Sequence, residues 1–221
     1  MLWGFLAMTT SLSHSAMAPS DLDRFLRHLG HEIRQPLSSI ESIAYYLDMV
    51  LGECGPEIQV QCAHLRRMVH QTNWLLEDTT LAIRTEYASH EAVQLEAHFR
   101  KLGADLALHE ERNLELVIED GLPPIQLPAG LTYFFCEHLI RFFREVSQAG
   151  DPIVIALSRE LGNLRADISA EIQTDVEEMR RILDPPEPGG TRRFITAAGG
   201  TMNVTAQAGS LELRILFPGV N

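Results

Sequence analysis

Apolar residues recur at steps of three and four between residues 20 and 88, which places them along one side of an α-helix. One such stripe ends at Gly52, Gly55 and Pro56, residues that break a helix, and a second stripe follows directly. The two stripes predict two long helices joined by a short turn, which is an antiparallel helical hairpin. The stripe positions are Leu22, Phe25, Leu26, Leu29, Ile33, Leu37, Ile40, Ala44, Leu47 and Leu51, then Ile58, Cys62, Leu65, Val69, Thr72, Leu76, Thr79 and Ile83.

Each predicted helix also carries apolar residues beside its stripe, among them Ile43, Val50, Met68 and Leu75. A single hairpin cannot bury faces this wide, whereas two hairpins can bury them in a four-helix bundle. The pattern therefore predicts a homodimer.

Short alternating segments and breakers replace the long stripes after residue 100. The expected strands are 114–118, 152–157, 164–169, 202–206 and 211–217, with a hairpin turn at Gly162-Asn163. Helices are expected at 131–147 and 175–183, a loop at 184–190 and a short helical or turn segment at 194–198. The predicted fold class is α+β, with the helical hairpin followed by an α/β sandwich that has one mixed sheet and helices on one face.

The chain divides into four expected parts. They are an N-terminal tail (1–19), the hairpin (20–88), a linker (89–100) and the α/β part (101–221). The tail is apolar and its segment Ser15–Ala18 resembles a signal-peptide cleavage site, but it lacks the basic residues that precede the apolar core of a signal peptide. A disordered tail, a misplaced start codon and an added turn of packing are the alternatives.

Composition excludes several classes of protein. A net charge of −12 argues against binding to nucleic acid, because phosphate backbones need clustered positive charge. No apolar run reaches the ~18 residues that cross a bilayer. The cysteines Cys54, Cys62 and Cys136 lack metal-ligand spacing and fit a reducing compartment. We therefore expect a cytoplasmic protein.

The candidate for chemistry is His31, which lies off the first stripe by about 200° from Leu29 at 100° per residue. It is expected to point outward, on a face shared with Arg34, Gln35, Ser38 and Ser42. An exposed neutral imidazole is a good nucleophile near neutral pH. A metal site with His28 is not expected, because no third ligand accompanies the pair.

Four neighbours of His31 have expected roles. Glu32 can orient the ring or take its proton, and Arg34 can offset the charge of a phosphoryl group. Gln35 can orient a water molecule. Pro36 removes one helical hydrogen bond and frees the carbonyl group of Glu32, so a helix bend is expected beside His31.

The segment His31–Leu37 reads HEIRQPL and closely resembles the H-box of sensor histidine kinases. The predicted hairpin resembles their dimerisation and phosphotransfer domain. The resemblance implies that His31 accepts a phosphoryl group and that Glu32 supports the chemistry. Gln35 stands where the family usually has the Thr or Asn that serves in phosphatase action.

Residues 101–221 resemble the ATP-binding domain of that family in outline, and the ending 198–218 resembles its last hairpin. Glu137 and Arg141 stand where the family has two Asn that help to hold nucleotide and magnesium. The segment 169–174 has no glycine where an adenine-binding Asp-x-Gly-x-Gly motif is expected, and Pro188–Gly190 is too short to rebuild the phosphate loop. The resemblance therefore implies a degenerate domain that does not use ATP.

The resulting hypothesis is a phosphotransfer protein, similar to bacterial histidine phosphotransferases, in which His31 exchanges a phosphoryl group with a receiver-domain aspartate. No tightly bound cofactor or metal ion is expected, and Mg²⁺ would come with the receiver domain of a response regulator. Another histidine kinase is a further possible partner. The alternatives are an active kinase that autophosphorylates His31 and a non-catalytic pseudokinase that serves as a dimerisation or docking module.

Overall fold

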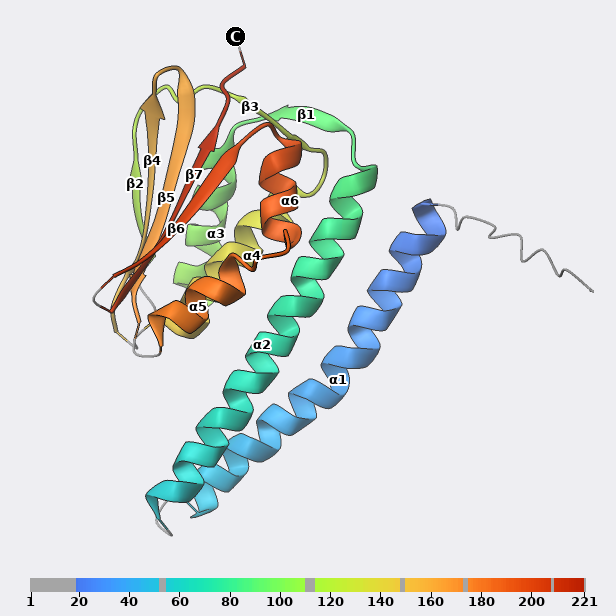
Figure 1. Ribbon diagram of the computed structural model, residues 1–221, viewed down its shortest axis with the longest axis vertical. Coiled ribbons are helices and arrows are strands. Elements are labelled where there is room, and N and C mark those ends of the chain that lie inside the picture. Colours follow the sequence, from blue (N-terminus) through green and yellow to red (C-terminus); the bar gives the residue numbers. More distant parts are fainter. Residues whose placement is uncertain are drawn as a thin grey trace, which may run out of the picture.

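The computed structural model describes residues 19–51, 55–109, 114–147, 150–172, 175–207 and 209–220, with only the backbone of residues 19–23 and 107–109. Two long helices, α1 (Pro19–Leu51) and α2 (Pro56–Tyr87), run antiparallel as a hairpin. The hairpin leads into an α/β layer structure that contains all the remaining helices and strands (Figure 1). The predicted fold class is confirmed: a helical hairpin followed by a mixed α/β sandwich.

The main sheet has five strands in the order β2-β4-β5-β7-β6. These strands are β2 (Leu114–Ile118), β4 (Ile153–Glu160), β5 (Asn163–Glu171), β6 (Thr201–Gln207) and β7 (Ser210–Phe217). Only β2 and β4 pair in parallel, and the other neighbours are antiparallel. Four helices lie on one face of this sheet in Figure 1: α3 (Leu95–His109), α4 (Thr132–Val146), α5 (Val176–Leu183) and α6 (Gly190–Ala197).

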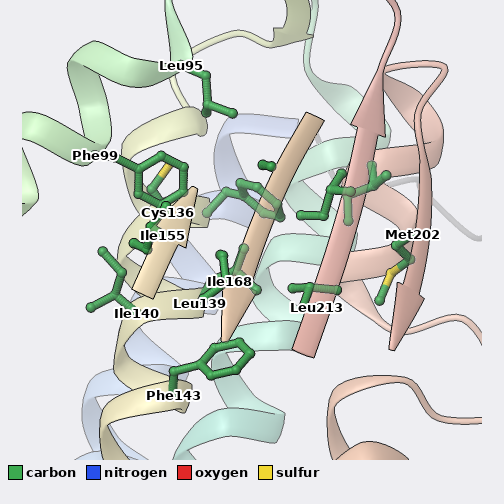
Figure 2. Close-up of a cluster of buried hydrophobic side chains, with 14 of the residues drawn as sticks. Leu95, Phe99, Cys136, Leu139, Ile140, Phe143, Ile155, Ile168, Met202 and Leu213 are labelled. Carbon is green, nitrogen blue, oxygen red and sulfur yellow. The ribbon is translucent and has the colours of Figure 1, made fainter. Parts of the chain in front are cut away.

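The hydrophobic core fills the space between the sheet and these helices. Buried and half-buried residues alternate along β4 and β5, so each strand presents one apolar face to the helices. Figure 2 shows side chains from both layers, with Leu139 and Phe143 of α4 beside Ile155 and Ile168 of the strands. The packing of the sheet against α4 thus follows from strand alternation and an apolar helix.

Residues 89–100, expected as a linker, contain ordered elements instead. Strand β1 (His90–Val93) pairs antiparallel with β3 (Ile125–Pro128), and α3 begins at Leu95. Val93, Leu95 and Phe99 are buried in the core, which is why this segment is fixed in place. The hairpin turn also differs, because Leu161 and Gly162, rather than Gly162-Asn163, separate β4 from β5 and have positive φ angles of 52° and 84°.

Helix α2 lies between α1 and the helices of the sandwich. Figure 1 shows α1 on the far side of α2, while α4 and α6 approach α2 from the side of the sheet. Helix α2 is therefore placed to connect the sandwich with α1. In the described part of the chain, no helix has an apolar stretch of the length and hydropathy needed to cross a membrane.

The expectations for the N-terminal tail and Cys54 fall on residues 1–18 and 52–54, outside the described residues.

Candidate functional site

His31 lies on α1, twelve residues after the helix begins at Pro19, and its side chain is exposed. Gln35, Ser38 and Ser42 are also exposed. A shallow groove on this side of α1 is lined by His31, Arg34, Gln35, Pro36, Ser38 and Ser39. An imidazole in an open groove is accessible to the phosphorylated side chain of another protein.

The His31 ring has one hydrogen-bond partner on its own helix. The Nε2 atom of Gln35 lies 3.3 Å from Nε2 of His31. In the tautomer with the ring proton on Nδ1, the Gln35 amide donates to Nε2 and thereby orients the lone pair of that nitrogen. The same lone pair is the one that a nucleophilic attack from Nε2 would use.

Glu32 is exposed, and within the described residues no hydrogen bond or ion pair joins it to the His31 ring. Pro36 lies inside α1, where it leaves the carbonyl group of Glu32 without its helical donor. The structure thus places Glu32 and Pro36 within about one turn of His31 without a direct contact to the ring.

Arg34 does not simply face outward with His31 as expected. Its side chain is 43% exposed, and Nη2 lies 3.2 Å from Oε1 of Glu77 on α2. The attraction of a buried carboxylate accounts for this orientation, because Glu77 is only 3% exposed. Arg34 therefore connects the His31 groove to the interior of the hairpin.

Glu77 is the centre of a cluster that joins three helices. Its Oε1 atom also accepts from Arg141 of α4, and Oε2 lies 3.3 Å from Nδ1 of the buried His138. Arg141 in turn pairs with Glu137 at 2.9 Å. Glu137 and Arg141 thus stand where the resemblance implies nucleotide-binding Asn residues. They form an ion pair with each other, and Arg141 also contacts Glu77 of α2.

Asp78, the next residue of α2, caps helix α6. Its carboxylate accepts from the backbone N–H of Gly190 at 2.6 Å, and from the backbone N–H and the hydroxyl group of Thr191 at 2.7 and 2.9 Å. These donors are the unsatisfied N–H groups at the start of α6, an end of a helix that attracts anions. A carboxylate of the hairpin therefore already occupies this position.

The ring of His138 lies between the two acidic residues. Its Nε2 atom is 3.5 Å from Oδ1 of Asp78, and the indole of Trp74 stacks on it with 3.7 Å between ring centroids. Burial by itself raises the pKa of Glu77 and Asp78, but the hydrogen bonds and charges of His138 and its neighbours outweigh it. Both carboxyl groups consequently have a pKa below the ordinary value and stay ionised.

Gly190 permits this close approach of α6 to α2. A Cβ atom on Gly190 would overlap the backbone carbonyl oxygen of Asp78, which cannot move without distorting α2.

We expect Gly190→Ala to destabilise the protein by about 1–3 kcal/mol, the usual cost of overpacking a tight contact. Urea unfolding measures this loss, and Gly130→Ala is not a suitable control because Gly130 has a positive φ of 69°. Gly30→Ala is the suitable one, since a Cβ there meets only a guanidinium nitrogen of Arg34 at 3.5 Å.

Sequence reasoning did not identify Glu77, Asp78, His138 or Trp74. The signal was present as two consecutive acidic residues within the second predicted helix, and as a histidine within the apolar segment that became α4. Within the described ranges, no group of three or more His, Cys, Asp or Glu side chains is arranged to hold a metal ion.

No model of a known protein family matches the sequence, and no curated protein sequence matches it significantly. Solved structures of histidine kinases do match in fold. The kinase AdeS of Acinetobacter baumannii is 16% identical with a TM-score of 0.53, over 86% of this chain and 98% of that one. Full-length ShkA in complex with AMPPNP is 18% identical with a TM-score of 0.51, over 90% of this chain but only 46% of ShkA.

The nucleotide-free catalytic domain of the kinase ThkA is 11% identical with a TM-score of 0.52, over 60% of this chain and 99% of that domain. The match to AdeS extends over most of the chain, whereas the match to ThkA covers a catalytic domain alone. The chain therefore has the fold of the histidine kinases, a helical hairpin followed by an α/β sandwich.

Proposed function

We propose that the protein is a histidine phosphotransfer protein of two-component signalling. His31 takes a phosphoryl group from an aspartate of one receiver domain and passes it to another. The observation that supports this proposal is an exposed His31 in an open groove, combined with a helix α6 whose N-terminus already holds the carboxylate of Asp78. The first feature suits exchange with a partner protein, and the second leaves little place for the phosphates of a nucleotide.

The transfer step involves one bond formed and one bond broken. The Nε2 lone pair of His31 attacks the phosphorus of the aspartyl phosphate, and the bond from phosphorus to the aspartate oxygen breaks, so the aspartate leaves as a carboxylate. Gln35 has to release Nε2 for this attack, since its amide donates to the same lone pair. Glu32, which does not contact the ring in this structure, would turn toward it to offset the positive charge that develops there and to accept the Nδ1 proton.

Arg34 supplies positive charge at the groove for the transferred phosphoryl oxygens. Because the guanidinium lines the groove and is partly exposed, it can meet these oxygens while Nη2 stays paired with Glu77. Mg²⁺ would be held by the acidic residues of the receiver, so the proposal assigns no metal ligand to this chain.

The hairpin, residues 20–88, would be the dimerisation and phosphotransfer domain, and residues 101–221 the ATPase-like domain. Large apolar side chains remain exposed on the hairpin, which a second hairpin would cover in a four-helix bundle of a homodimer. They include Ile40, Ile43, Tyr46, Met49, Val50, Val60, Leu65, Met68 and Leu75. The proposed location is the cytoplasm, where Cys62 and Cys136, which are buried and unpaired, would stay reduced.

Transfer of label from a receiver domain tests the proposed function. The protein is incubated with a receiver whose aspartate carries a radioactive phosphoryl group, in the presence of Mg²⁺. We expect the label to move to this chain and then to a second, unlabelled receiver. Label that never leaves the first receiver, across a panel of receivers from one proteome, would contradict the proposal.

Nucleotide binding separates this function from that of an autophosphorylating kinase. We expect titration with ATP or ADP and Mg²⁺ in a calorimeter to give no saturable heat up to about 1 mM nucleotide, a limit that corresponds to binding weaker than roughly −4 kcal/mol. The physical reason is that Asp78 and the Glu137–Arg141 pair occupy positions on α6 and α4 that the fold would use for phosphates and magnesium. Saturable binding, followed by label from ATP on His31, would favour the kinase alternative.

A further inference from the structure

Two rows of charged side chains cross the molecule from α1 through α2 to α4. The first row joins Arg34, Glu77 and Arg141, with the central carboxylate between two guanidinium groups. The second row has the opposite arrangement of charges, with a histidine between two carboxylates. His70 of α2 has its Nε2 atom 3.6 Å from Oε1 of Glu41 and its Nδ1 atom 3.2 Å from Oε2 of Glu145.

The spacing of the two rows matches the helix period. Arg34 and Glu41 on α1 are seven residues apart, as are Glu77 and His70 on the antiparallel α2, so each pair lies on one face of its helix. Arg141 and Glu145 are four residues apart on one face of α4. Sliding one helix by two turns would oppose like charges, so the rows favour a single register of the three helices.

The rows also flank the part of α1 that carries His31. Arg34 is three residues after His31, and Pro36, where the helical hydrogen bonding is interrupted, lies between Arg34 and Glu41. The segment of α1 on either side of Pro36 is thereby connected to α4, although α2 separates these two helices (Figure 1).

We propose that Glu77 and His70 are positioning residues that hold the His31 segment of α1 in a fixed orientation relative to the α/β part of the chain. This inference rests on the proposed function for its consequence in transfer, but the positioning itself is a property of the structure. The α/β part then acts as the support that fixes how His31 is presented to a receiver.

The second row depends on pH, because its central group is a histidine. The charged groups that face His70 are Glu41 from α1, Glu145 from α4 and Arg66 on α2 itself, while on the side of α5 the carboxylate of Glu178 accepts from Gln71. The hydrogen bond to Glu145 and the two carboxylate charges outweigh burial and Arg66, so the pKa of His70 lies above its ordinary value.

Because the pKa of His70 is raised, its contribution to stability decreases with increasing pH. A histidine whose pKa is raised by folding stabilises the fold fully below its ordinary pKa, and the contribution disappears as the pH rises through the raised value. The second row is therefore complete below the ordinary histidine pKa, and it is lost as the pH rises through the raised pKa of His70.

Two substitutions of His70 separate the effect of its positive charge from other effects of pH. His70→Arg keeps a positive charge at every pH, and a cavity of about 260 Å³ bordered by His70, Trp74 and Met179 offers room for the longer side chain. His70→Gln removes the charge at every pH. The matched control is His64→Gln, an exposed histidine of the same helix that makes no hydrogen bond or ion pair within the described residues.

The measurement is hydrogen exchange of the backbone amides of residues 31–48, corrected for the intrinsic effect of pH, together with the rate of label transfer to His31. At about pH 6 we expect His70→Gln to raise the exchange rate of this segment by about fivefold or more, the lower end of coupling between separate sites. The wild-type protein should approach the His70→Gln rate as the pH is increased through the raised pKa of His70, and His70→Arg should stay protected across the whole pH series.

The same experiment tests whether α4 takes part. Glu145→Gln is expected to raise exchange in residues 31–48 of α1, although Glu145 is on α4, whereas Glu212→Gln, which breaks an exposed pair with Arg214 on β7, is not. Unchanged protection of α1 in both His70→Gln and Glu145→Gln would overturn the proposal. If the wild-type protein takes no label at all, the proposed function fails while the exchange data still decide the positioning.

Discussion

His31→Gln is expected to reduce phosphoryl uptake from a labelled receiver by at least about a thousandfold, to the level of a protein without an acceptor. Glutamine keeps a polar side chain of similar length in the groove but has no ring nitrogen lone pair to attack phosphorus. Helix α1 should be unaffected, because His31 is exposed and, within the described residues, its ring hydrogen-bonds to Gln35 alone. The measurement is radioactive label retained by the protein after separation from the receiver.

His28→Gln is the matched control, since His28 is an exposed histidine one turn earlier on the same helix. It should take up label at the wild-type rate. Transfer to the His31→Gln protein at a comparable rate would mean that another residue accepts the phosphoryl group. A wild-type protein that binds the receiver yet never takes label would favour the alternative of a docking module without catalysis.

Asp78→Ala is expected to lower the free energy of unfolding by about 3–5 kcal/mol. The substitution leaves the buried N–H groups of Gly190 and Thr191 without an acceptor and removes one of the two carboxylates beside His138. Leaving one side of a buried ionic cluster without its partner is among the costliest changes in a protein core. Urea unfolding, followed by circular dichroism and by the fluorescence of the buried Trp74, measures the loss.

Asp175→Ala is the comparison that isolates burial. Asp175 caps α5 through Glu177 and Glu178 at 3.0 and 3.2 Å, but these contacts are exposed, so its loss should cost about 1 kcal/mol. If Asp78→Ala does not fold, Asp78→Asn keeps the shape and removes only the charge. Equal losses for Asp78→Ala and Asp175→Ala would show that the cluster on α2 has no special role.

The pH dependence of the same loss has a defined sign. The pKa of Asp78 and of Glu77 is lowered in the folded protein, so their stabilisation is complete above the ordinary carboxyl pKa of about 4 and disappears as the pH falls through the lowered values. The difference between the wild-type and Asp78→Ala proteins should stay constant between about pH 8 and 5 and shrink only below about pH 4.

The elements with strong periodic patterns were predicted well from sequence. The two apolar stripes gave the hairpin, now α1 and α2, and the alternating segments match the five strands of the main sheet to within three residues at each end. These elements bury one face against the rest of the molecule, and burial of one face places apolar residues at a regular spacing along the sequence.

Strand β1, strand β3 and the start of α6 were missed because they have no such period. Helix α3 was missed although its apolar residues do follow steps of three and four, at Leu95, Phe99, Leu102 and Leu106. Strand β1 has one buried residue, Val93, among four, and β3 is a four-residue strand that contains Pro128. Helix α6 begins at Gly190, inside a segment that its Pro and Gly content marked as a loop, because the carboxylate of Asp78 satisfies its first N–H groups from another element. A cap that is supplied from 112 positions away leaves no local sequence signal.

The candidate site also has one part that was predictable from sequence and one part that was not. His31, Arg34 and Gln35 follow one another on a single helix, so their proximity is fixed by the helix period and was predictable. The connection of Arg34 to Glu77 and Arg141 depends on how three helices pack, which no spacing along the chain reveals.

The close contact between Asp78 and Gly190 has a consequence for evolution. An acidic residue at position 78 is useful only if α6 can approach it, and α6 can approach only if position 190 has no Cβ atom. Substitutions at these two positions should therefore co-vary among related chains, with the acid and the glycine gained or lost together. Position 190 therefore needs glycine for the close contact that joins two parts of one chain, and not for an unusual backbone conformation.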